Sequence, residues 1–389
     1  MIELSEQFSP DISSETGKKH NEEAEQVYKA YLRGKPERVP FICGEWIGQH
    51  GFYADEIGLD YRKYYTNPDL MIQVQLEAAR RRRELPLHDN IPICKVPTES
   101  WCVGVDLWPV IAAGWLGCPI EYNKITQIAN RSLHLSKEEC DMLQMPDLTS
   151  GGLLATMNKF YKHMVGEYAN KLCFLGKTVD FIQCMAGSNG VFSLALDLRG
   201  ENIMTDMYED SEFVHRFLNK LADWIESLEI AWQKGVQKPY SISDHGTDML
   251  SPETYEEFII PILLRKNKNS LDKKHDFHHC GVGQKLFPVI AKYFKINSVH
   301  AVTYPTLNIE KIREDVGEDA WVIVCLDEGI LKYGKPDDVR YAVKQLLTDK
   351  VKGSGGISIM SGDLVRGVNM DNMYVLYDAI REYGCYKQI

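Results

Sequence analysis

The chain has 389 residues, of which 44% are hydrophobic and 25% are charged, and its formal net charge is −11. This length suffices for one large domain or two ordinary ones, and the acidic balance argues against a role in nucleic-acid binding. We expect no signal peptide, because the first twenty residues are polar, and no apolar run is long enough to cross a bilayer. The ten cysteines contain no CxxC pair, so we expect a cytoplasmic protein with reduced thiols.

The N-terminal part of the sequence predicts an arm followed by a first strand. Residues 1–37 are rich in charged side chains and show helical periodicity from Asn21 to Leu32, so we expect an N-terminal helical arm before the main domain. The apolar stretch Arg38–Cys43 predicts a short β-strand. The stretch from Pro68 to Arg83 predicts a long helix.

Two aromatic-rich stretches are candidates for lining a binding site. The loop after the first strand carries Glu45 and Trp46, and Tyr53 follows a few residues later. Between residues 90 and 150, short apolar segments are interrupted by glycine and proline, and we expect an inserted excursion of strands and loops that covers one end of the main domain. Trp101 lies in this excursion, where its ring fits either a packed core or the wall of an aromatic-lined cavity.

After residue 150 the sequence alternates regularly between predicted helices and strands. The predicted helices are residues 152–168, Ser211–Trp232, a helix that begins at Pro252 after an N-cap at Ser251, Gln284–Phe294, Leu307–Val316, Pro336–Leu347 and Met370–Tyr383. The predicted strands are Lys171–Lys177, Tyr240–Asp244, a strand that ends at Cys280, Asn297–Val302, Ala320–Leu326, which we expect to be buried on both faces, and Ile357–Met360. Together with the strands before residue 150, the number of predicted strands is about eight. This number favours one α/β domain, a (β/α)8 TIM barrel over residues 38–389.

Polar side chains follow several of the predicted strands. Asp244 and His245 come directly after one strand, and Glu45 follows the first. In a (β/α)8 barrel the carboxyl ends of all strands meet at one mouth, where active sites lie. Glu45, Asp244 and His245 are therefore candidates for acid–base catalysis, although each carboxylate taken alone is also an ordinary helix N-cap. His300 fits a site residue or a hydrogen-bonded core histidine equally well.

The strongest chemical signal is the segment His275–Gly281, which reads HDFHHCG. His278 and Cys280 are two residues apart, so in a strand their side chains point to the same face. An imidazole and a thiolate side by side at the end of a strand form half of a zinc site. The alternative interpretation is a buried cysteine beside a core histidine. We favour zinc because the pair ends a strand, where barrel enzymes place their sites.

Several segments resemble the uroporphyrinogen decarboxylase-like barrels, in the branch of zinc-containing, corrinoid-dependent methyltransferases that includes O-demethylase and methylcobalamin:coenzyme M methyltransferases. His278–Gly281 matches the His-x-Cys-Gly element of that branch, and Arg38–Pro40 matches its first strand. The further matching segments are Asp244–Pro261, Cys325–Asp327, Gly334–Val339, Ser361–Asp363, Asn372 and Gly384. The resemblance extends from about Arg38 to Tyr383 and implies a zinc enzyme whose corrinoid is carried by a partner protein.

Two departures from the family bear on function. The uroporphyrinogen decarboxylases carry an arginine-rich loop after the first strand, whereas Gly44–His50 contains no arginine and one acid, Glu45. Such a loop would repel a tetrapyrrole with many carboxylates, so we do not expect decarboxylation. In addition, Asp363 stands where the family has its second zinc cysteine. A carboxylate ligand in place of a thiolate makes zinc a harder Lewis acid, which suits activation of an ether oxygen.

The resemblance and its departures together imply transfer of a methyl group from a methoxylated aromatic donor to the Co(I) corrinoid of a partner protein. The zinc ligands that it implies are His278, Cys280 and Asp363. The alternatives for the third ligand are Glu45, Cys325 and Asp248. The residues expected to bind the aromatic donor are Trp46, Tyr53 and Trp101.

Two other functions stay open at this point. A second-step enzyme would move the methyl group from a methylcorrinoid to tetrahydrofolate or to a thiol, and a second thiolate ligand, Cys325, would favour it. A barrel of a different class would bind a corrinoid or a small aromatic compound without catalysis. Stoichiometric metal content would distinguish that barrel from both enzymes.

Overall fold

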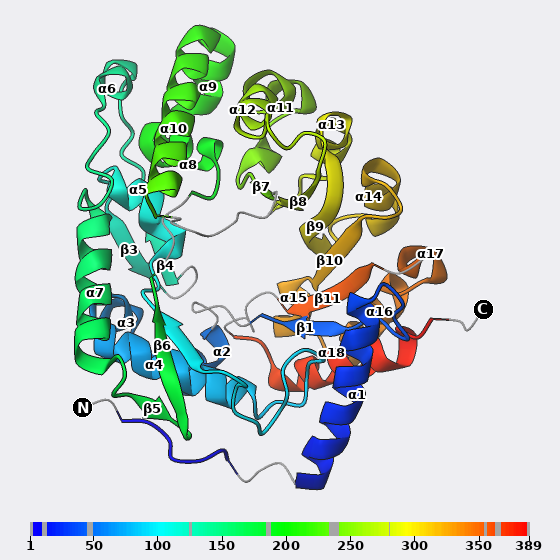
Figure 1. The fold of residues 1–389 in the computed structure, drawn as a ribbon. Helices are drawn as coiled ribbons and strands as arrows, with labels where there is room; N and C mark the ends of the chain where they lie inside the picture. Colours follow the sequence, from blue (N-terminus) through cyan, green and yellow to red (C-terminus); the bar gives the residue numbers. More distant parts are fainter. Residues whose placement is uncertain are drawn as a thin grey trace.

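A computed structural model of the chain shows helices arranged around an arc of parallel β-strands (Figure 1). The residues that it describes are 3–9, 14–44, 50–123, 127–183, 188–232, 241–279, 281–353, 356–361 and 367–386. Within these ranges, no helix combines the length and the apolarity that a membrane crossing requires.

The barrel strands fall into two hydrogen-bonded groups. One group is a parallel sheet in the order β1 (Phe41–Cys43), β11 (Ile357–Ser361), β10 (Trp321–Leu326), β9 (Lys295–Tyr304), β8 (Lys274–His278) and β7 (Ser241–Ser243). The other group is the parallel pair of β2 (Trp101–Gly104) and β6 (Lys177–Ile182).

The order of these strands is that of a (β/α)8 barrel. The first strand pairs with the last, with Phe41 of β1 opposite Ile359 of β11, and the remaining strands follow one another in chain order. Among the described residues, no ladder joins β1 to β2 or β6 to β7. The α/β barrel class expected from the strand–helix alternation is therefore confirmed.

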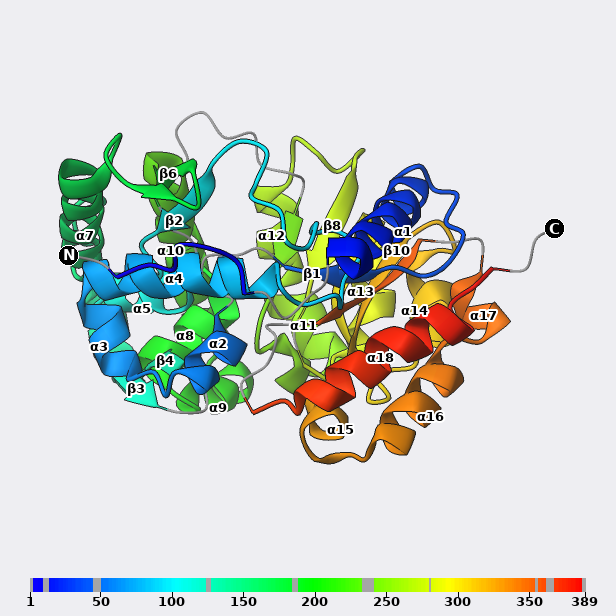
Figure 2. The same cartoon turned by 90° about the horizontal axis from the view of Figure 1, so that it is seen from below.

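Helices connect and cover the strands. Those before and beside the β2–β6 pair are α2 (Gly51–Glu56), α3 (Tyr61–Thr66), α4 (Pro68–Arg82), α7 (Leu153–Tyr168), α8 (Val191–Arg199), α9 (Asn202–Glu209) and α10 (Ser211–Trp232). Those that cover the larger sheet are α11 (Pro252–Phe258), α12 (Ile260–Lys266), α13 (Phe287–Tyr293, preceded by the 3-10 turn Gln284–Leu286), α14 (Ile309–Val316), α15 (Glu328–Tyr333), α16 (Pro336–Leu346), α17 (Asp349–Lys352) and α18 (Met370–Tyr383). Figure 2 shows α16 and α18 side by side on the outside of the barrel.

The N-terminal arm is helix α1 (Ser14–Leu32), which packs on the barrel. The Tyr31 ring lies 4.5 Å from the Trp321 ring, centroid to centroid, and its hydroxyl donates to Ser358 Oγ at 3.1 Å. Trp321 begins β10 and Ser358 lies near the start of β11, so α1 covers the amino ends of these strands. The opposite, carboxyl ends stay available for a site.

The excursion expected near residues 90–150 contains a barrel strand, β2, and becomes an insertion only after it. The inserted elements are the 3-10 turn η1 (Trp108–Val110), α5 (Ile111–Trp115), the antiparallel hairpin of β3 (Ile120–Asn123) and β4 (Gln127–Asn130), and α6 (Lys137–Met142). This insertion lies within the connection from β2 to its parallel neighbour β6, and it therefore occupies one side of the barrel.

Two strand predictions need correction. The predicted strand Lys171–Lys177 is interrupted at Leu175 and Gly176, where φ is +46° and +77°, so the chain reverses and β5 (Cys173–Phe174) pairs antiparallel with β6. Glycine adopts this conformation without strain, and the barrel strand starts only afterwards. In β10, buried residues alternate with half-buried ones, so the expected burial on both faces is not observed.

Candidate active site

The carboxyl ends of β7 and β8, and the middle of the longer strand β9, bring polar side chains to one level of the barrel. Ser243 of β7 is in register with His278 of β8, and His278 is in register with His300 of β9. Asp244 and His245 follow β7 directly, so they reach the same edge of the sheet. The structure thus brings together Asp244, His245 and His278 from the sequence candidates, and it adds His300, for which the sequence left two interpretations open.

Three imidazoles form a cluster at this edge. The Nδ1 atoms of His278 and His300 lie 2.7 Å apart, and the ring centroids of His245 and His278 lie 4.7 Å apart. Burial lowers the pKa of His245 and of His300 to about 4, with a further decrease from the neighbouring His278. Burial also lowers the pKa of His278. The three rings are therefore neutral at pH 7, which is the form that ligates a metal or accepts a proton.

Asp244 holds the neighbouring loop in place. Its carboxylate is 3% exposed and accepts a hydrogen bond from the Tyr255 hydroxyl at 2.5 Å and from His279 Nδ1 at 3.0 Å. Tyr255 comes from α11, which starts after the N-cap Ser251 as the sequence predicts. Burial raises the pKa of Tyr255 well above its ordinary value, so this hydroxyl stays a donor. Asp244 therefore links β7 to both α11 and the His279 segment.

Two glycines allow the chain after β8 to pass close to these side chains. Gly281 has a φ of +105°, and a Cβ atom there would lie 2.5 Å from Asp248 Oδ2. A Cβ atom on Gly283 would lie 1.9 Å from His279 Nε2. The segment that reads HHCGVG thus needs glycine at both positions for steric reasons. Asp248, one alternative for the third metal ligand, lies against the chain that follows position 280.

The predicted zinc ligands are only partly within the described residues. Cys280 and Asp363 lie outside them, and among the described residues no group of three potential ligands has metal-binding geometry. In the sequence, position 280 comes two residues after the end of β8 and position 363 two residues after the end of β11.

Two buried imidazole nitrogens and the chemistry of the predicted ligands bear on whether zinc fits this region. In the part of the chain that is described, His279 Nε2 and His300 Nε2 are buried without a hydrogen-bond partner. A neutral imidazole, a thiolate and a carboxylate are a ligand set that zinc accepts with one position left open. The donor types at positions 278, 280 and 363 match such a set, and a zinc site there stays a prediction.

The remaining sequence candidates are distributed over other elements. Glu45 and Trp46 lie outside the described residues. Tyr53 lies in α2 and is half-buried, and burial raises its pKa. Trp101 is 2% exposed at the amino end of β2, where its Nε1 donates to the Phe174 carbonyl at 2.8 Å. This is the packing of a core residue, so a contact between Trp101 and a substrate stays a prediction.

A second buried polar group was missed at the sequence level. Asp106 follows β2 by two residues, is 5% exposed and accepts a hydrogen bond from the Tyr64 hydroxyl at 3.0 Å. His50, which is fully buried, places its Nδ1 3.9 Å from Asp106 Oδ2. The signal was available, because Val103-Gly104-Val105-Asp106 is an apolar strand followed by a carboxylate, the same pattern that drew attention to Asp244.

Comparisons with known proteins agree with this fold. The family model described as uroporphyrinogen decarboxylase (URO-D) matches residues 22–383. Among solved structures, a methyltransferase from Methanosarcina mazei has a TM-score of 0.59 to this chain at 18% sequence identity, covering 92% of this chain and 98% of that one. At this identity the likeness concerns the fold alone. A search of curated proteins found no match.

Proposed function

The chain belongs to the uroporphyrinogen decarboxylase (URO-D) family, and on this premise we propose that it is a methyltransferase that moves a methyl group from a methoxylated aromatic donor to the Co(I) corrinoid of a partner protein. The observation that carries the proposal is the cluster of neutral imidazoles of His245, His278 and His300, at the level of the barrel where β7 and β8 end. The similarity in fold to a methyltransferase supports it.

The charges near the mouth argue against decarboxylation of a polycarboxylate. Such a substrate needs fixed cations to hold its carboxylates. The segment Gly44–His50 supplies Glu45 and neither arginine nor lysine. The imidazole cluster adds no positive charge, because burial keeps His245 and His300 neutral at pH 7. An uncharged aryl methyl ether has no comparable requirement.

The metal belongs to the same proposal. His278, Cys280 and Asp363 would hold zinc, which when bound supplies a Lewis acid toward the ether oxygen of the donor. A carboxylate in the ligand set favours an oxygen atom over a sulfur atom as the substrate ligand. This preference supports an ether donor over a thiol acceptor.

The remaining roles in the reaction, positioning and proton transfer, are assigned to residues of the chain itself. Methyl transfer breaks the bond between the methyl carbon and oxygen, the electron pair stays on oxygen, and the oxygen takes up one proton. Because Asp244 already accepts hydrogen bonds from Tyr255 and His279, we assign it a positioning role. His245, on the loop after β7, is neutral at pH 7, so we propose that it or Glu45 relays this proton from solvent to the oxygen.

A spectroscopic assay tests the proposal directly. The protein is mixed with a corrinoid protein in the Co(I) state and a panel of methoxyarenes, and the cobalt spectrum is followed for methyl-Co(III). We expect methyl transfer from at least one aryl methyl ether, and a loss of at least 100-fold in His278→Ala (about 2.7 kcal/mol in the barrier). Methylation of tetrahydrofolate or a thiol from a methylcorrinoid, with no reaction from any ether, would contradict it.

A further inference from the structure

His300 contacts the segment that carries the predicted zinc ligand His278 in two ways. The Nδ1 atoms of the two rings lie 2.7 Å apart, and the His300 backbone carbonyl accepts a hydrogen bond from the His279 N–H at 2.7 Å. The two ring centroids lie 4.7 Å apart, with an angle of 39° between the ring planes, so the rings are tilted and meet through their Nδ1 edges. The short distance between the Nδ1 atoms is therefore a hydrogen bond between two imidazoles.

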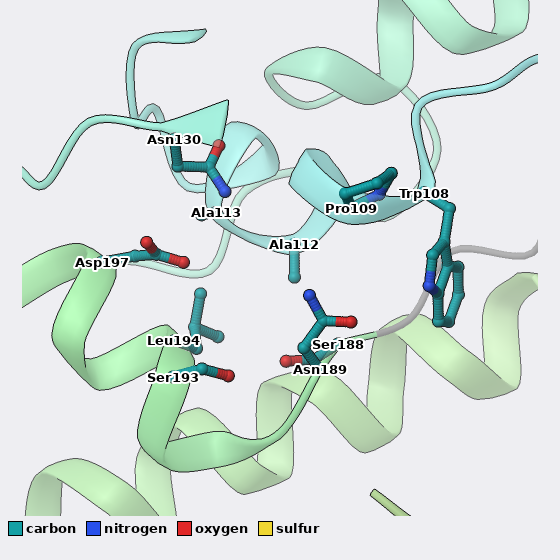
Figure 3. Close-up of a pocket in the computed structure, with 10 residues that line it drawn as sticks. All are labelled: Trp108, Pro109, Ala112, Ala113, Asn130, Ser188, Asn189, Ser193, Leu194 and Asp197. Carbon is teal, nitrogen blue, oxygen red and sulfur yellow. The ribbon is translucent and has the colours of Figure 1, made fainter. Parts of the chain in front are cut away.

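His300 differs from His245 in how the chain holds it. His300 lies within β9, which pairs on one side with β8 and on the other with β10, and its neighbour Val299 is fully buried. His245 lies on the loop after β7, where its backbone N–H donates to the Asn189 carbonyl at 2.8 Å. Asn189 and Asp197 line a cavity of about 30 Å³ beside α8 (Figure 3). A central strand therefore sets the place of the His300 ring, whereas His245 belongs to a loop beside a cavity.

The hydrogen bond between the two rings limits where their protons lie. Of the two Nδ1 atoms, one must carry a proton and donate while the other accepts. A histidine binds a metal through a nitrogen that carries no proton. Because Nδ1 of His278 is engaged with His300, metal ligation by His278 uses Nε2, and its proton is then on Nδ1. In the part of the chain that is described, His300 Nε2 is buried without a hydrogen-bond partner, so no second hydrogen bond within that part competes for the tautomer of His300.

We propose that His300 is a positioning residue for the zinc site: its Nδ1 accepts a hydrogen bond from His278 Nδ1–H and holds His278 in the tautomer whose Nε2 carries no proton. The inference rests on the proposed function, to which the metal belongs. A ligating histidine commonly donates its other ring N–H to a carboxylate, a carbonyl or water, which orients the ring and makes the ligating nitrogen more basic. Here the imidazole of His300 takes the place of that acceptor.

Zinc affinity tests this without a methyl donor or a corrinoid. The full chain is stripped of metal, and its affinity for zinc is measured by competition with a chromophoric chelator. His300→Leu removes the acceptor, and the affinity should decrease about 10–100-fold. His300→Asn is branched at the same carbon as leucine but has an amide oxygen that accepts a hydrogen bond, so its affinity should stay within about threefold of the wild type. His215→Leu, at a partly exposed histidine on α10, should leave the affinity unchanged, and thermal unfolding confirms that each metal-free variant is folded.

The tautomer of His278 gives a second readout. NMR spectroscopy of zinc-bound protein labelled at the histidine nitrogens should show a protonated Nδ1 and a non-protonated Nε2 for His278, assigned by the absence of these signals from His278→Gln. The Nδ1 proton should exchange slowly with solvent in the wild type and in His300→Asn, and rapidly in His300→Leu.

The results separate this inference from the proposed function. Unchanged zinc affinity in His300→Leu, an equal loss in His300→Leu and His300→Asn, a proton on Nε2 of His278, or no zinc binding at all would overturn the positioning role, even if methyl transfer is observed. Weaker zinc binding in His300→Leu that His300→Asn restores would support it, even if no methoxyarene donates its methyl group to a corrinoid.

Discussion

Removing the carboxylate of Asp244 should destabilise the folded chain by an amount that the structure allows us to state. The carboxylate is 3% exposed and accepts hydrogen bonds from two buried donors, the Tyr255 hydroxyl at 2.5 Å and His279 Nδ1 at 3.0 Å. Asp244→Ala leaves both donors without an acceptor. Each buried group left unsatisfied costs about 1–3 kcal/mol, so the free energy of unfolding should decrease by about 2–6 kcal/mol.

Denaturant unfolding followed by circular dichroism measures this loss. Asp244→Asn should lose less, about 1–3 kcal/mol, because the amide oxygen still accepts one of the two hydrogen bonds. Asp248→Ala is a matched control in the same loop, since its half-buried carboxylate accepts, among the described residues, a long hydrogen bond of 3.4 Å from the Val282 N–H, and we expect a loss below about 1 kcal/mol. A loss in Asp244→Ala no larger than that of the control would refute the positioning role.

Three further predictions concern the loop after β8, the Asp197 carboxyl group and the metal. Gly283→Ala places a Cβ atom on the ring of His279 and should lower the free energy of unfolding by about 2 kcal/mol or more, measured by the same method; an unchanged value would mean that the loop yields freely. Because the pKa of Asp197 is raised to about 6, its contribution to stability is present below about pH 4 and is lost as pH rises through 6. The free energy of unfolding of Asp197→Asn, relative to that of the wild type, should therefore increase by about 2 kcal/mol from pH 4 to pH 7. A difference that does not change with pH would contradict this. Elemental analysis should find one zinc per chain in the wild type and less in Cys280→Ser and Asp363→Ala, whereas full occupancy in both variants would exclude these ligands.

Much of the fold was predictable because the signals are local. Helix α18 spans Met370–Tyr383 and α10 spans Ser211–Trp232, the bounds that hydrophobic periodicity and charge pattern predict. Ser251 caps α11 because a serine before proline at a helix start satisfies free backbone N–H groups. These features depend on residues within a few positions of one another, so the printed sequence contains all that is needed.

The candidate site was predictable as far as it follows from fold class. Once the chain is a barrel of parallel strands, the residues after each strand must meet at one end. This places Asp244, His245 and His278 together without knowledge of any side-chain contact. The same rule applied to every strand would have found Asp106, whose position after β2 was hidden because the region around it was taken as an excursion.

The sequence by itself thus determined the periodic elements, the barrel class and the polar residues at the strand ends. The tertiary structure alone decided that His300 lies 2.7 Å from His278, that Tyr255 and His279 both donate to Asp244, and that β6 begins after a turn at Gly176. These outcomes depend on strand register and on the packing of helices far apart in the chain. A one-residue change of register would turn each side chain to the opposite face, and no local pattern in the sequence specifies which register forms.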